Sequence, residues 1–213
     1  MLFPNVPSQP KDFFEKLYHG RGYHRIAGLD EVGRGSLAGP VVAAAVVLER
    51  TSKLPGVRDS KLLTEARRQE QFGEIVLSAV AYGFGVVEAE TVDRINVLEA
   101  TREAMMAAVS SLPEPPDALL IDALDLPGLD LPQHSLIHGD RRCLSIAAAS
   151  ILAKVFRDEM MKDLDTFFPV YRFRSNKGYG TSEHLRALSA HGPSPLHRLT
   201  FAGVRPTLFR EGN

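Results

Sequence analysis

A glycine-rich stretch between two apolar segments constrains the fold of this chain most. Residues 26–29 and 41–48 are apolar, and their connection begins with two carboxylates and a Gly-Arg-Gly turn at 33–35. The second segment is rich in valine and follows a Gly-Pro pair, which is typical of a β-strand. Because the connection is short and rich in glycine, we expect the two strands to form an antiparallel hairpin.

Helical and strand patterns alternate along the rest of the chain. Helices are predicted at 12–18, 64–79, 91–112, 144–164 and 182–191. Further strands are predicted at 81–88, 118–121 and 135–137. A hairpin followed by alternating helices and strands predicts an α/β fold with a mixed sheet. In such a sheet, functional side chains gather where several strands end.

The length of the chain predicts one domain over 1–213, with an N-terminal lead at 1–24 and a C-terminal extension over about 165–213. Its single cysteine, Cys143, excludes an internal disulfide and fits a reducing compartment. The longest apolar run is far shorter than the roughly 20 residues that span a bilayer, and the first residues lack the pattern of a secretory signal. We therefore expect a cytoplasmic protein with no membrane partner.

Charge is distributed unevenly, although the net charge is only −1. Residues 141–213 hold 12 Lys and Arg against 6 Asp and Glu, whereas residues 1–140 hold 13 against 20. A basic C-terminal third suits a polyanionic substrate such as nucleic acid. Ordinary variation among solvated surface charges explains the same numbers equally well.

Acidic residues follow three of the apolar segments. Asp30 and Glu31 follow the first predicted strand, and Asp122 and Asp140 follow two later ones. If the four carboxylates converge, their repulsion favours a divalent cation, and a site made only of oxygen ligands is typical of Mg²⁺ or Mn²⁺.

Strand geometry adds a condition to this hypothesis. Successive side chains of a regular strand point to opposite faces, so Asp30 and Glu31 reach one site only if the strand bends. Gly33 makes such a bend accessible. The spacing also allows three separate roles: a solvated acidic pair, a turn at Asp122 and a helix cap at Asp140.

Several short motifs follow one another along the chain. They are Asp30-Glu-Val-Gly-Arg-Gly35 with Leu37-Ala-Gly-Pro40, Asp59-Ser-Lys61 with Leu63, the strand ending at Asp122, Gly139-Asp140, the helix 145–154 with Arg157-Asp158, Lys177-Gly-Tyr-Gly-Thr181 with His184, and His197-Arg198. In this order they resemble the ribonuclease HII family (type 2 ribonuclease H) over about 26–205. The related type 3 enzymes generally carry lysine in the Gly-X-Gly turn, where this chain has Arg34.

The resemblance implies a ribonuclease H-like fold, a mixed sheet flanked by helices with a short C-terminal helical extension. It implies an endoribonuclease that hydrolyses the RNA strand of RNA–DNA hybrids. Such an enzyme also nicks duplex DNA 5′ of an embedded ribonucleotide, leaving 3′-hydroxyl and 5′-phosphate ends. The catalytic and metal-binding residues implied are Asp30, Glu31, Asp122 and Asp140, holding Mn²⁺ or Mg²⁺, with two ions during catalysis. We expect a monomer whose partners are these duplexes.

The resemblance also implies how substrate binds. Gly33, Arg34 and Gly35 match the turn that recognises the ribose 2′-hydroxyl, and Tyr179 matches a tyrosine that packs on the adjoining sugar. The 2′-hydroxyl is the group that distinguishes RNA from DNA. Further substrate-binding residues are Lys177 and Thr181. The cations expected to neutralise phosphates are Arg34, Lys177, Arg141 and Arg142.

Alternatives stay open for some of these residues. Tyr179 could instead be a core tyrosine, and Arg141 and Arg142 could lie on a plain solvated face. The family usually has glycine where this chain has Ala123, and lysine where it has His138. Alanine disfavours a positive φ, and a histidine titrates near neutral pH. A non-catalytic duplex-binding protein with the same fold is therefore a second hypothesis.

Other kinds of site are disfavoured by the sequence. His184, His191 and His197 do not match a usual zinc spacing, and no cysteine lies near them. The glycine-rich turn lacks the Gly-Lys-Ser/Thr of a nucleotide-binding loop. No serine lies in a Gly-X-Ser-X-Gly elbow, and a lone thiol such as Cys143 is more often inert than nucleophilic.

Overall fold

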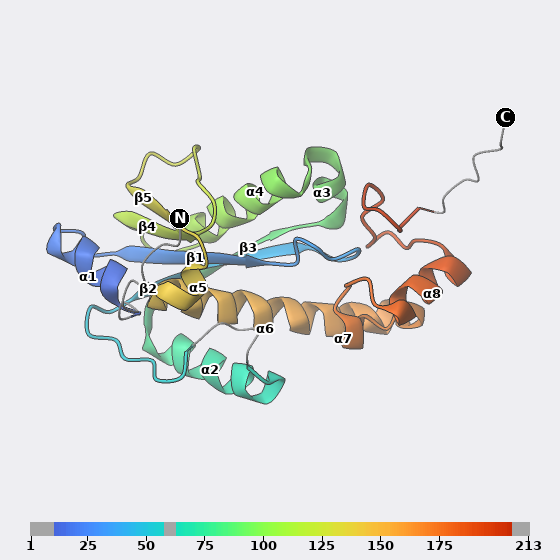
Figure 1. Cartoon of the computed structure of the whole chain (residues 1–213), viewed down its shortest axis with the longest axis horizontal. Coiled ribbons are helices and arrows are strands. Elements are labelled where there is room, and N and C mark those ends of the chain that lie inside the picture. The colour runs from blue at the N-terminus through green and yellow to red at the C-terminus, as the bar shows by residue number, and fades with distance from the viewer. Residues whose placement is uncertain (1–10, 58–62, 206–213) are drawn as a thin grey trace, which may run out of the picture.

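The computed structural model describes residues 11–57 and 63–205 (Figure 1). Asp59, Ser60 and Lys61, which form one of the sequence motifs, lie outside the described residues.

The centre of the fold is a mixed sheet in the order β3-β2-β1-β4-β5. Its strands are β1 (Ile26–Val32), β2 (Val41–Leu48), β3 (Ala79–Val87), β4 (Ala118–Asp122) and β5 (Gln133–Leu136). Strands β1, β2 and β3 pair antiparallel, whereas β1, β4 and β5 pair parallel. The predicted hairpin and the predicted mixed sheet are both confirmed.

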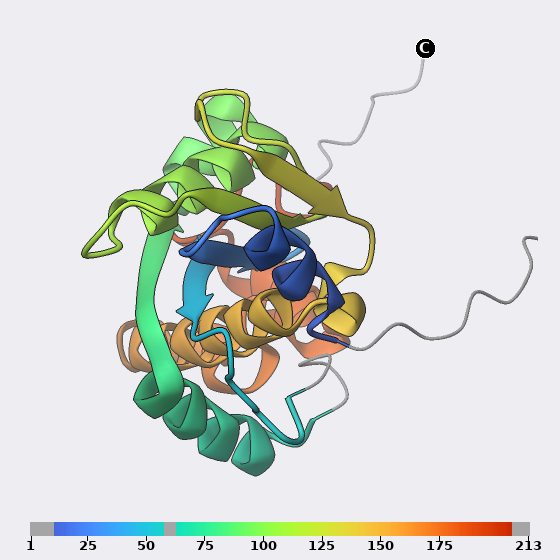
Figure 2. The same ribbon diagram turned by 90° about the vertical axis from the view of Figure 1, so that its left-hand side faces the viewer.

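Helices cover both faces of the sheet. They are α1 (Phe13–Gly20), α2 (Glu65–Ser78), α3 (Ala89–Ile95), α4 (Val97–Ser110), α5 (Gly139–Arg142), α6 (Leu144–Phe167), α7 (Phe173–Asn176) and α8 (Ser182–His191), with a 3₁₀ turn, η2, at Pro169–Tyr171. Figures 1 and 2 show α4 on one side of the sheet and α6 on the other, with α2 beyond α6. Within 11–57 and 63–205, no helix has both the length and the apolar character needed to cross a bilayer.

Small residues let the two covering helices approach the sheet closely. A Cβ placed on Gly28 of β1 would lie 2.3 Å from the backbone of Ser145 at the start of α6. A Cβ on Gly85 of β3 would lie 2.0 Å from the carbonyl oxygen of Ala104 in α4. Residues 147–149 of α6 are three consecutive buried alanines. The alanine-rich part of α6 therefore packs close to the sheet.

Strand β1 continues past its predicted end. It remains paired with β2 through Val32, with Asp30 opposite Ala44 and Glu31 opposite Ala43. The prediction that the strand ends at residue 29 and bends at the acids was therefore wrong. Pairing with β2 supplies hydrogen-bond partners that keep this part of the strand extended.

The single helix predicted at 91–112 is two helices. The break lies at Asn96, whose φ of 69° is left-handed. Its side chain accepts hydrogen bonds from the N–H groups of Leu98 and Glu99, so it caps the N-terminus of α4. Its ψ of 164° lies outside the left-handed helical region, in a conformation found almost only in glycine, and the two side-chain hydrogen bonds help to hold it.

Candidate active site

The four predicted acids open onto one cavity of about 590 Å³. The cavity is lined by Asp30, Glu31, Val32, Asp122, His138, Asp140, Arg141, Ser150, Lys154 and Tyr179. These residues come from strands β1 and β4, helices α5 and α6, and the loops beside β5 and α8. The fold thus brings together side chains that are almost 150 positions apart in the sequence.

The end of β4 explains how both acids of β1 reach the same cavity. Pairing between β1 and β4 stops at Leu29 and Ile121, one residue before Asp122. Beyond that point the β4 side of β1 has no neighbouring strand within the described pairing, so the edge of β1 is open at the two acids. Asp30 and Glu31 therefore both line the cavity without the predicted bend.

Asp30 is buried and its charge is costly. Its side chain is 6% exposed, and its Oδ1 accepts the Glu31 N–H at 2.7 Å. Burial raises the pKa of Asp30 well above its usual range, and the neighbouring carboxylates of Glu31 and Asp122 raise it further. A hydrogen bond from Ser150 acts in the opposite direction.

Glu31 holds an oxygen without a partner. Its Oε1 lies 3.3 Å from Nη1 of Arg34, whereas its Oε2 is buried and makes no hydrogen bond within the described residues. Burial raises the pKa of Glu31, and the charge of Arg34 lowers it. A buried oxygen of this kind costs free energy unless a donor or a cation approaches it.

Two left-handed residues shape the other side of the cavity. Ala123, which follows Asp122, has a φ of 53°, and His138 has a φ of 56°. Between them, the Gly139 N–H donates to Oδ1 of Asp122 at 2.7 Å, which links the end of β4 to α5. Asp140 lies in the first turn of α5 and is 8% exposed. It therefore belongs to a short helix and does not directly follow a strand.

The acids fit a divalent cation in chemistry, but they do not yet form a closed cage. Within the described residues, no three His, Cys, Asp or Glu side chains stand in positions that would hold an ion as they are. The pKa values of Asp30 and Glu31 are nevertheless raised, and Oε2 of Glu31 has no partner within the described residues. Both features are expected of a cation-binding site whose carboxylates are surrounded by protein groups alone.

The Gly-Arg-Gly turn is held by two buried guanidinium groups. Arg157 and Arg198 are both fully buried. Arg198 donates to the carbonyl of Arg34 at 2.9 Å and to that of Gly39 at 2.8 Å. Gly33 has a φ of +93°, and a Cβ there would lie 2.3 Å from Nε of Arg157. Glycine is therefore required at 33 by both conformation and space.

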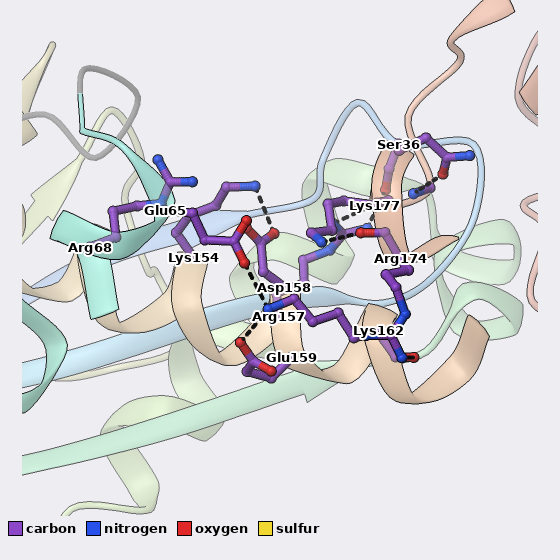
Figure 3. A network of polar contacts seen from close by, with 12 residues as sticks. Ser36, Glu65, Arg68, Lys154, Arg157, Asp158, Glu159, Lys162, Arg174 and Lys177 are labelled. Atoms are coloured by element: carbon purple, nitrogen blue, oxygen red, sulfur yellow. Dashed lines mark hydrogen bonds and ion pairs between the residues drawn. The ribbon is translucent and has the colours of Figure 1, made fainter. Parts of the chain in front are cut away.

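Tyr179 lies beside cations at the cavity. Nζ of Lys154 lies 5.8 Å from its ring centroid, and Cζ of Arg157 lies 5.6 Å from it. Lys154 also forms an ion pair with Asp158 at 2.7 Å, one turn along α6 (Figure 3). The half-buried ring of Tyr179 keeps one part available to the cavity.

Other predicted substrate residues do not line this cavity. Lys177 donates to the carbonyl of Arg174 (Figure 3). Thr181 is exposed and caps α8 by accepting the His184 N–H at 3.2 Å. Arg142 stacks over the ring of Phe14 at 5.4 Å. Among the cations expected to meet phosphates, Arg141 lines the cavity and Arg34 lies at its edge through its contact with Glu31.

Ser150 and Lys154 are cavity residues to which the sequence reasoning gave no role at the site. Both occur in the α6 motif, where a spacing of four residues places them on the same face of the helix. Cys143 is buried at the start of α6, and its thiol donates to Glu15. Burial and the charge of Glu15 raise the pKa of this thiol well above its usual range, which fits an inert cysteine.

Comparisons with known proteins show the family of this chain. The family model described as Ribonuclease HII matches residues 27–204. Ribonuclease HII of Geobacter sulfurreducens is 50% identical over 207 residues, which cover 97% of this chain and 95% of that protein. The crystal structure of ribonuclease H2 from Pyrococcus horikoshii OT3 has a TM-score of 0.73 at 25% identity and covers 84% of this chain and 95% of that one.

A third comparison concerns the fold alone. The crystal structure of Bst-RNase HIII in complex with Mn²⁺ has a TM-score of 0.64 at 24% identity, covering 92% of this chain and 72% of that one. The resemblance seen in the motifs and the predicted ribonuclease H-like fold are both confirmed. This chain belongs to the ribonuclease HII family and is an endoribonuclease.

Proposed function

We propose that this endoribonuclease uses divalent cations to hydrolyse RNA in RNA–DNA hybrids and to nick duplex DNA 5′ of an embedded ribonucleotide. Its products carry 3′-hydroxyl and 5′-phosphate ends. Membership of the ribonuclease HII family supports endoribonuclease activity on RNA–DNA hybrids. The cation requirement and the nick at single ribonucleotides are the finer parts of the proposal.

One observation carries the proposal. Four carboxylates line one cavity, and one of them presents a buried oxygen that has no partner among residues 11–57 and 63–205. Like charges in a buried site raise one another's pKa, whereas a divalent cation removes the repulsion and keeps them ionised. The Mn²⁺ complex of Bst-RNase HIII, which shares the fold, is consistent with this chemistry.

The residues that would hold the ions are Asp30, Glu31, Asp122 and Asp140. When bound, divalent ions supply an acidified water and stabilise the charge that develops in phosphodiester hydrolysis. Ser150 keeps Asp30 oriented through its hydrogen bond, and the Gly139 N–H does the same for Asp122. These contacts fix the direction of the carboxylates before substrate binds.

The substrate would lie between the Gly-Arg-Gly turn and Tyr179. A Cβ on Gly35 would meet no atom within 4 Å, so the backbone there is open to a ribose. Tyr179 offers a flat ring to the adjoining sugar. Lys154 and Arg141, which line the same cavity, would neutralise the phosphates on either side.

A duplex with one ribonucleotide tests this function. We expect a nick on the 5′ side of that nucleotide with Mg²⁺ or Mn²⁺ and none in chelator. Asp30→Asn and Asp140→Asn should abolish cleavage while duplex binding survives, because each removes a charge at the ions. Asp163→Asn, which changes an exposed acid of α6, should cleave like the parent enzyme. Turnover retained by both active-site variants would contradict the ligand assignment.

A non-catalytic duplex-binding role is the second candidate. It draws on the two departures from the family pattern, Ala123 and His138, which are both left-handed and both beside the cavity. If the duplex binds measurably but stays intact with Mg²⁺ and also with Mn²⁺, this role would be favoured over the nuclease.

A further inference from the structure

Two buried histidines form a continuous hydrogen-bonded chain that ends on the backbone of Tyr179. Nδ1 of His184 lies 2.9 Å from the carbonyl oxygen of Tyr179. Nε2 of His184 lies 2.9 Å from Nε2 of His197. Nδ1 of His197 lies 2.9 Å from the backbone nitrogen of Ser194. We call this series the histidine relay.

The two ends of the relay fix the tautomer of both rings. The backbone N–H of Ser194 is a donor, so Nδ1 of His197 accepts and its proton is on Nε2. The carbonyl of Tyr179 is an acceptor, so His184 carries its proton on Nδ1 and leaves Nε2 free to accept. The contacts at the two ends therefore independently require the tautomers in which the Nε2–H of His197 donates to Nε2 of His184.

The relay works only if both rings are neutral. A second proton on His184 would set its Nε2–H against the Nε2–H of His197 at 2.9 Å, and a second proton on His197 would set its Nδ1–H against the Ser194 N–H at 2.9 Å. His184 is fully buried and His197 is 2% exposed, and both pack against the rings of Tyr171 and Phe173. Burial lowers the pKa of each histidine, which favours the neutral form.

The relay ties Tyr179 to a part of the chain outside its own turn. The Tyr179 carbonyl also accepts the Thr181 N–H at 2.8 Å, but Thr181 belongs to the same turn and moves with it. His197, by contrast, forms a β-bridge with Ala38, and the next N–H, that of Arg198, donates to the carbonyl of Leu37 at 2.8 Å.

The segment around His197 therefore contacts both Tyr179 and the Gly-Arg-Gly turn. The segment around His197 carries Arg198, which holds the carbonyl of Arg34 at 2.9 Å. The same segment reaches Tyr179 through His184. The Gly178 carbonyl adds a direct link between these parts, because it accepts hydrogen bonds from the N–H groups of Leu37 at 2.8 Å and Ala38 at 3.2 Å.

We propose that His184 and His197 are positioning residues for substrate binding, which fix the place of Tyr179 relative to the Gly-Arg-Gly turn through one defined pair of tautomers. The inference rests on the proposed function in one respect, since it takes Tyr179 to contact the sugar. Neither histidine touches the reacting atoms; both act through the Tyr179 backbone.

The tautomers can be measured without substrate. Long-range ¹H–¹⁵N spectra of the ¹⁵N-labelled enzyme at pH 7 should show His184 protonated at Nδ1 and His197 at Nε2. His191 is exposed at the end of α8 and serves as an internal reference for a solvated ring. The opposite tautomer at either position, or a charged ring, would overturn the relay.

A double-mutant cycle tests the consequence for cleavage. His184→Ala and Tyr179→Ala should each lower kcat/KM at a single ribonucleotide by roughly tenfold to a hundredfold, because misplacement of a binding group costs rates of that order. The double variant should be no slower than Tyr179→Ala alone. If the two effects multiply, His184 does not act through Tyr179.

Conservative variants separate positioning from folding. His184→Asn keeps an N–H donor for the Tyr179 carbonyl, so its kcat/KM should lie closer to the parent than that of His184→Ala. His191→Ala should cleave like the parent. If His184→Asn is as slow as His184→Ala although folded, the bond to Tyr179 is not what matters. Unchanged cleavage by Tyr179→Ala would refute the sugar contact in the proposed function. The tautomers of His184 and His197 would then be tested by the NMR spectra alone.

Discussion

Ala123 has a φ of 53° directly after Asp122, and the substitution Ala123→Gly is expected to stabilise the folded chain. A left-handed conformation costs an L-residue about 1–2 kcal/mol. Glycine avoids that cost but loses about 0.5–1 kcal/mol more backbone entropy on folding. The methyl group is exposed, so little buried surface is lost. The net expectation is a gain of about 0.5–1 kcal/mol in the free energy of unfolding.

Urea denaturation and thermal melting measure this gain. For a chain of this size the melting temperature should rise by about 1–4 °C. The matched control is Ala107→Gly, at an exposed position in the last turn of α4. That variant should lose about 1 kcal/mol, because glycine is a poor helix former. If Ala123→Gly is as unstable as Ala107→Gly, the argument from backbone conformation fails.

Three further predictions concern charge. Arg198→Met should lower the free energy of unfolding by about 2–4 kcal/mol and slow cleavage, since the carbonyls of Arg34 and Gly39 lose their buried donor; Arg205→Met, at an exposed site, should do neither in urea or nuclease assays. Burial and His184 lower the pKa of His197 from 6.5 to about 4. Between these pH values the unfolded chain binds a proton that the folded chain excludes, so about 3 kcal/mol of stability should be lost as the pH falls from 6.5 to 4. His197→Asn should show a smaller loss between pH 7 and 4.5 in parallel urea titrations, and an equal loss would contradict the assignment. Mn²⁺ at ten times its dissociation constant should add about 1.4 kcal/mol, or a melting shift of about 3–6 °C, and a similar shift in Asp30→Asn would remove that residue from the ion site.

Local patterns were enough to predict much of this fold. The valine-rich strand β2 and helix α8 were predicted with their observed bounds, because each is flanked by strong turn or cap residues. The break at Asn96 was missed since apolar spacing continues through it. The end of β1 was placed too early because two acids interrupt an apolar run, whereas the hydrogen bonds to β2 continue regardless of side-chain polarity.

The sequence predicted the four acids of the candidate site and, among the other residues that line it, Tyr179 and Arg141. The carboxylates stand out because each follows an apolar segment, and the structure brings all four to one cavity. The burial of Arg157 and Arg198 could not be foreseen from composition, since arginine is usually exposed. Their hydrogen-bond partners are backbone carbonyls and, for Arg157, also the hydroxyl of Ser36, so the sequence offers no complementary acid to indicate them.

Lys177 and Thr181 show the limit of reasoning from a short motif. They flank Tyr179 closely in sequence, yet the left-handed backbone at Lys177 and Gly178 turns the chain sharply. Neighbours in the motif therefore face different surroundings. The histidine relay escaped notice for the opposite reason: its two rings are 13 positions apart and meet only after α8 has folded back.

The late position of Arg198 in the sequence has a consequence for folding during translation. The Gly-Arg-Gly turn leaves the ribosome early, but the guanidinium that clamps its carbonyl is translated more than 160 residues later. Until then the nascent polypeptide can form its sheet while the Gly-Arg-Gly turn lacks this buried donor. If the turn recognises the ribose as proposed, cleavage should therefore begin only after residue 198 has been translated and has folded onto the turn.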